Sequence, residues 1–189
     1  MGIRIGAEPN SKSTAVLCQN GFLMNQTTSA AALAKYWRQC RTQMPKLPPR
    51  RPKAWSFGAT PAHADELLAL VLAGIKTGTA SALWELEFSG ETLPQIGELS
   101  IILDGAHAPG ALIETVDIAI VPFNKVTAEH AAAEGEGDRS LEYWRESHER
   151  FWRQYSSGPR GFARDMPIVC ERFQLLLPPA QAGRDVVNH

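Results

Sequence analysis

The segment GIKTGT, residues 74–79, places an amine and a hydroxyl three residues apart in a chain of 189 residues. It leaves a helical apolar pattern and enters a strand-like one, so its polar side chains are expected at one mouth of a small barrel. When burial favours the neutral amine, Lys76 can take a proton from water or from the hydroxyl of Thr79. The alternative is structural, because a cation just after a helix C-terminus is stabilised by about 0.3–1 kcal/mol.

The segment EGEGDRS, residues 134–140, is a second candidate. Its two glycines allow a sharp, open turn, and the N–H groups at the start of the following helix suit an anion such as phosphate. Glu134 is a candidate general acid or hydrogen-bond acceptor in this turn. A capped loop explains the same pattern, since Asp138 is expected to cap the next helix and the three acids repel phosphate unless they face away.

Four aromatic residues, Trp55, Phe57, Trp84 and Trp144, lie close in sequence to these two polar segments. Aromatic faces can stack a nucleobase, which contributes roughly 1–3 kcal/mol per base in single-strand recognition. Such residues more often belong to a core, and Trp144 in particular lies on an expected helical stripe. The sequence is therefore compatible both with aromatic residues that stack on a nucleobase and with aromatic residues of the core.

Metal and cofactor chemistry have little support in the sequence. The glycine-rich phosphate loops, the HExxH zinc motif and the GxSxG nucleophile motif are missing, and the five histidines are dispersed. The three cysteines are scattered and never paired as CxxC, so neither a disulfide framework nor a zinc site is expected. A secretory signal and a membrane-spanning apolar run are missing too, so the expectation is a cytoplasmic protein with no cofactor and no membrane partner.

Apolar periodicity and turn residues predict a mixture of helices and strands. Thr60 and Pro61 are a strong helix start, because Thr is a good N-cap and Pro suits the first helical position. The expected elements are a helix at 29–41, a proline-rich linker at 44–53, a helix from 61 to about 74, strands at 80–88, 99–103 and 111–121, helices at 124–133 and 138–155, and a strand at 167–177. This order predicts an α+β fold built on a small mixed β-sheet or barrel.

Two helical stripes are expected to be buried. The first consists of Leu33, Tyr36, Trp37 and Cys40, and the second of Leu141, Trp144, His148, Phe151 and Tyr155.

Charge is divided unevenly along the chain. Residues 1–64 carry nine basic side chains and one acid, a net charge of +8, whereas residues 65–189 have a net charge of −9. This asymmetry predicts a basic arm beside an acidic body, and an acidic body favours a nucleoside-sized ligand over long RNA. The expected divisions are a poorly ordered tail at 1–28, a helix and basic linker at 29–53, a folded domain at 54–177 and a frayed end at 178–189.

Over residues 54–177 the sequence resembles the ASCH family, the activating-signal-cointegrator homology domain, in its bacterial stand-alone form. The resemblance implies a PUA-like small mixed β-barrel with flanking helices, related to RNA-binding modules, with RNA or a nucleoside as ligand. It is carried by the segments WSFG (55–58), ADEL (64–67), GIKTGT (74–79), LWE (83–85), GELS (97–100), VPF (121–123), EGEGDRS (134–140) with Trp144, and DMPIVCERF (165–173).

The resemblance also implies a chemistry. Some members of the family remove the acetyl group from N4-acetylcytidine with a Lys, a Thr three residues later and a Glu that follows a His, which correspond to Lys76, Thr79 and Glu134. Other members similar to this longer type are ribonucleases. This chain departs from the amidohydrolase subgroup because it has Ser81 where that subgroup tends to have Arg, and because the subgroup lacks the EGEGD turn and the aromatic helix after it.

The leading hypothesis is thus a hydrolase of a modified nucleoside or RNA. Lys76 would activate the nucleophile, Thr79 would be that nucleophile or position a water, and Glu134 would shuttle a proton to the leaving group. The residues expected to shape the base and sugar pocket are Trp55, Trp84, Asp138, Arg139 and Ser140. The alternatives are an endoribonuclease and a non-catalytic RNA-binding module whose basic linker contacts phosphates. The oligomeric state is left open.

Overall fold

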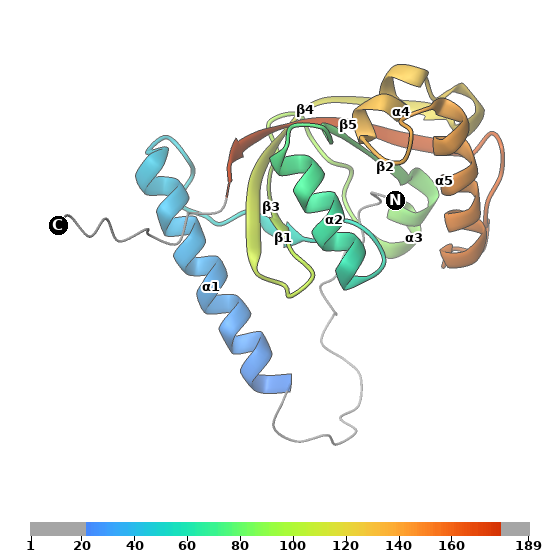
Figure 1. Ribbon diagram of the computed structural model, residues 1–189. Helices are drawn as coiled ribbons and strands as arrows, with labels where there is room; N and C mark the ends of the chain where they lie inside the picture. Colours follow the sequence, from blue (N-terminus) through green and yellow to red (C-terminus); the bar gives the residue numbers. More distant parts are fainter. Residues whose placement is uncertain (1–21, 179–189) are drawn as a thin grey trace.

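The centre of the molecule is a five-stranded, curled sheet with the strand order β1-β3-β4-β5-β2 (Figure 1). The computed structural model describes residues 22–178, with side chains from residue 30. The strands are β1 (Lys53–Trp55), β2 (Gly78–Ala82), β3 (Leu99–Leu103), β4 (Pro109–Pro122) and β5 (Pro167–Leu177). The short β1 runs parallel to β3 and every other pairing is antiparallel, so the sheet is mixed and the predicted α+β class with a small mixed sheet is confirmed.

Helix α2 (Pro61–Leu72) covers what we call the inner face of the sheet. Leu67, Leu68 and Val71 of this helix pack on an apolar patch made by Trp55, Phe57, Ile102, Ala111, Ile113 and Phe173. A Cβ on Gly110 would lie 2.3 Å from a methyl carbon of Leu68, so only glycine lets the helix approach β4 this closely. The predicted helix start is confirmed, because the Thr60 side chain accepts a hydrogen bond from the N–H of His63 and Pro61 is the first helical residue.

Helix α1 (Phe22–Gln43) packs on the opposite, outer face along β3 and β4 (Figure 1). Its predicted stripe is confirmed, since Leu33, Tyr36, Trp37 and Cys40 are all buried. The Tyr36 hydroxyl donates to the carbonyl oxygen of Leu177 at 3.1 Å, and Trp37 Nε1 donates to that of Pro49 at 3.3 Å. The helix therefore belongs to the folded body.

Helix α1 also begins earlier than expected. Residues 22–28, assigned to a poorly ordered tail from the sequence, are helical, and the remainder of that tail, like residues 179–189, lies outside the described residues. The sheet also begins earlier than expected. Strand β1 starts at Lys53, the last residue of the segment 44–53 that was expected to be an extended linker.

The remaining helices cover the other end of the sheet, on the outer side of β2 and β5. They are α3 (Leu83–Ser89), the 3-10 turn η1 (Phe123–Lys125), α4 (Ala128–Glu134) and α5 (Leu141–Tyr155). Ala80, Ile168 and Cys170 of the sheet pack there against Trp144 and Trp152 of α5. Burial and the nearby Glu134 carboxylate raise the pKa of the Cys170 thiol to about 12, and burial also raises the pKa of the Cys40 thiol on α1.

Three local predictions were wrong. Residues 83–88 belong to helix α3 and not to the second half of a strand. The prediction failed because LWELEF alternates like a strand. In the helix, Leu86 is the buried residue, and Gly90, at φ +72°, caps the C-terminal end. The N-cap of α5 is Ser140, whose hydroxyl accepts from the N–H of Tyr143, whereas Asp138 lies before it. On α5, Trp152 is buried in place of the predicted Tyr155, which is 54% exposed.

Among residues 22–178, no helix is long and apolar enough to cross a membrane.

Candidate active site

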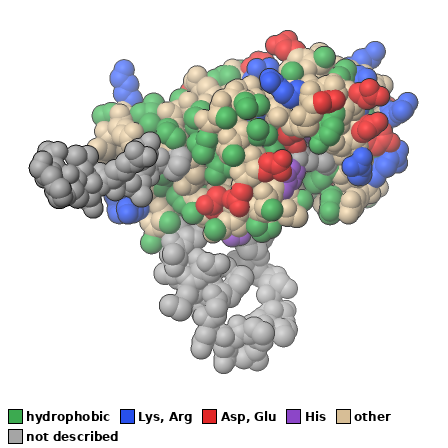
Figure 2. All heavy atoms as spheres, in the orientation of Figure 1, with side chains coloured by type: hydrophobic (Ala, Val, Ile, Leu, Met, Phe, Trp, Pro, Cys, Tyr) green, Lys and Arg blue, Asp and Glu red, His purple; other side chains and the backbone are tan. Residues whose placement is uncertain are grey.

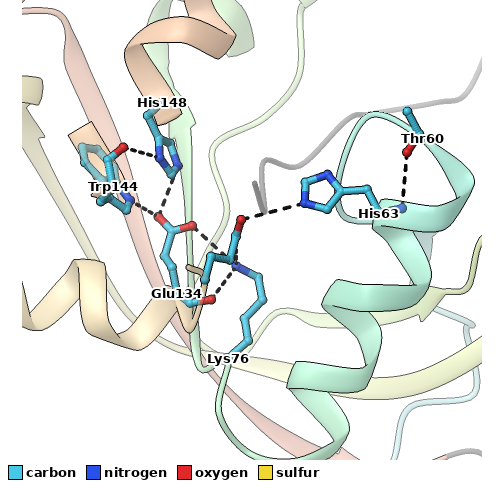
Figure 3. A network of polar contacts seen from close by, with 7 residues as sticks. Thr60, His63, Lys76, Glu134, Trp144 and His148 are labelled. Atoms are coloured by element: carbon cyan, nitrogen blue, oxygen red, sulfur yellow. Dashed lines mark hydrogen bonds and ion pairs between the residues drawn. The ribbon is translucent and has the colours of Figure 1, made fainter. Parts of the chain in front are cut away.

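The ammonium group of Lys76 lies completely buried where the chain leaves α2 and approaches β2 (Figure 3). Gly74, at φ +70°, ends the helix and turns the chain so that Lys76 points toward the turn after α4. Lys76 Nζ donates to the backbone oxygen of Glu134 at 3.2 Å and lies 3.5 Å from Glu134 Oε2 and 3.2 Å from Glu136 Oε1. It also lies 5.0 Å from the ring centroid of Phe57. These oxygen acceptors of the amine thus all belong to one turn, residues 134–136.

The Glu134 carboxylate lies between Lys76 and the buried side of α5. Trp144 Nε1 donates to Glu134 Oε1 at 2.6 Å, and the Nε2 atoms of His130 and His148 lie 3.3 and 3.5 Å from the same oxygen. His130 precedes Glu134 by four residues on α4, so both side chains share one helix face. This oxygen is therefore surrounded by donors from two helices.

His148 is held by two acceptors. Its ring stacks on Trp144 with centroids 4.1 Å apart, and its Nδ1 lies 2.9 Å from the backbone oxygen of Trp144. Its other nitrogen faces the carboxylate of Glu134. A carbonyl oxygen and a carboxylate oxygen thus face the two ring nitrogens.

Electrostatics keep Glu134 ionised. Burial raises the pKa of its carboxyl group, but the charges of His148 and Lys76 and hydrogen bonds from His130 and His148 outweigh burial. Together they hold the pKa well below the ordinary value of 4.5. In the resting state Glu134 is thus a carboxylate that can accept a proton.

This shift predicts a pH dependence of stability. The carboxyl pKa is lower in the folded than in the unfolded chain, so the contribution of Glu134 is complete above about pH 4.5 and is lost as the pH falls through the folded-state value. Urea unfolding should therefore show that Glu134→Gln loses several kcal/mol relative to wild type near neutral pH, as for other broken buried ion pairs (~3–5 kcal/mol), and that this gap narrows below about pH 4.5. The exposed Glu146→Gln is the control, and a gap independent of pH would contradict the prediction.

Glu136 and His63 complete the network, although neither was predicted as a site residue. Glu136 Oε2 lies 3.9 Å from Nε2 of His63 on α2, while Glu136 Oε1 faces Lys76. Burial lowers the pKa of His63, against the opposing charge of Glu136. The sequence signal for Glu136 was its place two residues after Glu134, and in the structure both carboxylates face Lys76.

Thr79 lies on the inner face of the sheet. It is buried in β2 opposite Glu171 of β5, and directly paired residues of antiparallel strands share a face. Phe173, two residues after Glu171, shares that face and stacks on Phe57, the ring beside which Lys76 Nζ lies. Glu171 itself is a buried carboxylate that was not predicted, and it accepts from Thr115 Oγ1 at 3.4 Å.

The predicted pocket residues are spread over three places. Trp55 is buried with its ring edge-on to Phe57, 4.6 Å between centroids, so it belongs to the wall near Lys76. Trp84 instead lines a separate pocket with Glu85 and Arg160, whose guanidinium lies over the indole. The aromatic pattern in the sequence did not show that Trp55 and Trp84 lie in two different places in the fold.

Asp138, Arg139 and Ser140 shape the turn before α5. The Asp138 carboxylate accepts from the N–H of Ser140 at 2.8 Å, and Arg139 Nε donates to the backbone oxygen of Ala132 at 3.4 Å. Arg139 has φ +65°, and the hydroxyl of Ser140 caps α5. In these contacts the three residues hold the turn that carries Glu134 and Glu136.

No group of three or more His, Cys, Asp or Glu side chains that could hold a metal ion is found within the described part of the chain, residues 22–178.

Comparisons with known proteins agree with this fold. The family model of the ASCH domain matches residues 53–177. A crystal structure of a protein from Enterococcus faecalis V583 is similar, with 32% identity, a TM-score of 0.73, and coverage of 85% of this chain and 98% of that one. The crystal structure of an ASCH domain from Lactobacillus crispatus JV V101 is 27% identical, with a TM-score of 0.63 and coverage of 83% and 96%. Among curated proteins, none matches significantly.

Proposed function

This chain belongs to the ASCH domain family, whose PUA-like domains generally bind RNA, and we propose that it is a hydrolase that removes an acetyl group from a nucleoside of the N4-acetylcytidine type. The observation that carries the proposal is the buried contact between Lys76 and Glu134, the two residues that correspond to catalytic positions of the family's amidohydrolases. Burying two charges costs desolvation free energy, so a buried ion pair is a poor way to stabilise a fold. A catalytic role explains the presence of the pair better.

The pair supplies the two proton transfers that amide hydrolysis needs. Transfer of one proton from Lys76 to Glu134 gives a neutral amine beside a neutral acid. The low pKa of the Glu134 carboxyl makes this form a minor one, and the reaction proceeds through it as it forms. The amine takes a proton from the Thr79 hydroxyl, or from a water held by it, and the resulting oxygen nucleophile adds to the acetyl carbon. The acid returns its proton to the departing nucleoside nitrogen, so acetate and the free amino group result after water is consumed.

The surroundings fit a small, aromatic substrate. Trp55, Phe57 and Phe173 form an aromatic wall next to Lys76. Toward the α4–α5 end, acidic and basic side chains lie side by side on the surface, as Figure 2 shows, without the single-sign patch expected of a long-RNA groove. A nucleoside needs no such patch, because stacking and hydrogen bonds bind it.

The test is an assay of purified protein with N4-acetylcytidine, in which chromatography measures cytidine and acetate. We expect turnover by wild type and none by Thr79→Val, which keeps the shape of the side chain without its hydroxyl. Ser89→Ala, at the exposed end of α3, is the matched control. Absence of turnover by wild type on acetylated nucleosides would rule out the amidase.

An RNA-binding role is a second candidate, favoured by the surface of α1 and the linker. The apolar stripe of α1 packs on the sheet, and the basic side chains of α1 and of the linker are exposed: Lys35, Arg38, Arg41, Lys46, Arg50, Arg51 and Lys53. Lys35 and Arg38 share a shallow groove on the helix. These side chains can contact phosphates, and all of them except Lys53 lie outside the 53–177 region that matches the family.

For this second role we predict RNA affinity that falls steeply with salt. Lys35→Gln combined with Arg38→Gln should weaken binding and reduce the slope of log K against log salt by about 1–2, since each lost phosphate contact removes about 0.7–0.9. Fluorescence anisotropy with a labelled single strand measures both quantities, and Gln39→Ala in the same groove is the control. An unchanged slope would exclude this surface. RNA cleavage that is lost in Lys76→Ala and Glu134→Gln would instead indicate an endoribonuclease.

A further inference from the structure

The two oxygens of Glu136 face two different bases. Oε1 lies 3.2 Å from Lys76 Nζ, and Oε2 lies 3.9 Å from His63 Nε2 (Figure 3). The exposed fraction of the side chain rises along this series, from 0% for Lys76 to 11% for Glu136 and 25% for His63. The three side chains therefore form a line from the buried pair to the surface.

The other contacts of the pair lead into the core. On the far side of Lys76, the Glu134 carboxylate is 1% exposed and meets Trp144, His130 and His148. The side chains of these histidines are 9% and 3% exposed. Among these contacts, all within residues 22–178, the path through Glu136 thus ends at the most exposed side chain, His63.

His63 is fixed in place at the outer end of this line. Its backbone N–H donates to Thr60 Oγ1, and its ring lies against Gly58. A Cβ on Gly58 would be 2.7 Å from His63 Nδ1, and Gly58 has φ +75°, so this glycine leaves the room that the ring occupies. The imidazole is therefore held facing Glu136.

We propose that Glu136 and His63 are proton-relay residues that carry protons between Lys76 and the solvent. The inference rests on the proposed function for its purpose, because each round of hydrolysis forms acetic acid, which loses one proton at neutral pH, and that proton has to leave the buried site. In the relay, Lys76 gives a proton to Glu136 Oε1, Glu136 gives one from Oε2 to His63 Nε2, and His63 releases one to water. The 3.9 Å gap is closed by a small side-chain movement or one bridging water.

The chemistry of the three groups suits this transfer. A carboxylate with one oxygen toward a donor and the other toward an acceptor can pass a proton without rotating. Because burial lowers the pKa of His63, its ring is neutral at neutral pH and able to accept. Glu136 belongs to the EGEGD turn that the resembling amidohydrolases lack, so this path is a property of the longer chain.

The experiment measures exchange of the Lys76 Nζ protons with water by NMR on protein labelled with 15N-lysine, without substrate. His63→Gln should slow this exchange by about tenfold or more, and free imidazole in the buffer should restore it, as for other positioned proton carriers. His107→Gln, on the exposed turn between β3 and β4, is the control. Glu136→Gln, which keeps the size of the side chain, should slow exchange too and should not be rescued by imidazole.

The relay would be overturned if the Lys76 Nζ protons of His63→Gln exchanged as fast as those of the His107→Gln control and if imidazole did not change this rate. Because no substrate is present, this result is independent of the proposed activity. Slow, rescued exchange in a protein that hydrolyses no acetylated nucleoside would support the relay and refute only the amidase. In an active enzyme, the relay further requires that His63→Gln lowers kcat at low buffer concentration while KM stays unchanged.

Discussion

Lys76→Met should lower the rate of nucleoside deacetylation by about 10³-fold or more, since it removes a proton carrier worth ~10²–10⁴ and the cation that Glu134 and Glu136 share. Met keeps the length and apolar stem of the side chain, so it fills the same volume beside Phe57. The measurement is kcat/KM for N4-acetylcytidine. Lys125→Met, an exposed lysine in η1, is the control and should retain full activity.

The same substitution leaves Glu134 and Glu136 without their cation. Breaking a buried ion pair typically costs about 3–5 kcal/mol, so lost activity must be separated from lost folding. Adding Glu134→Gln removes one of the stranded charges and should recover part of the unfolding free energy while activity stays absent. A Lys76→Met enzyme that is folded and still active would contradict the catalytic role of Lys76.

Trp37→Ala should destabilise the protein by about 3–5 kcal/mol, the usual cost of deleting a buried tryptophan. Trp37 is 5% exposed in the cluster that joins α1 to β3 and β4, and its indole N–H donates to Pro49. Urea unfolding measures the change, and the neighbouring exposed Lys35→Ala is the control. Equal stability of the two variants would mean that α1 adds nothing to the fold, contrary to the packing described above.

Local signals predicted the fold where they agreed with tertiary packing. Strands β3 and β5 and the start of α2 have the expected bounds, because their apolar runs are closed by glycine, proline or a Thr-Pro cap. Helix α3 escaped prediction because LWELEF has the period of a strand. In the structure, Glu85 of this helix accepts hydrogen bonds from the backbone N–H groups of Ser157 and Gly158. Those partners lie more than 70 residues away, beyond any local pattern.

The site was predicted less completely. The family resemblance pointed to Lys76 and Glu134, and the structure brings them together across 58 residues of sequence. Glu136 and His63 were missed because their contacts arise only in the folded chain. The direction of the turn after α4 brings Glu136 to Lys76, and the packing of α2 beside this turn brings His63 to Glu136. Trp84 was misplaced for the related reason that residues near each other in sequence separate once α3 forms.

Cys40 and Cys170, which are buried in the described part of the chain, can act as reporters of how the molecule opens. Cys40 lies on the side of α1 that packs on the sheet, and Cys170 lies between the sheet and α5. Burial keeps both thiols protonated and closed to reagents. A thiol-specific reagent can modify each one only while its own cover is lifted. Peptide-resolved labelling rates would therefore show whether the N-terminal helix detaches separately from the end that holds the Lys76–Glu134 pair, or whether both halves open in one cooperative step.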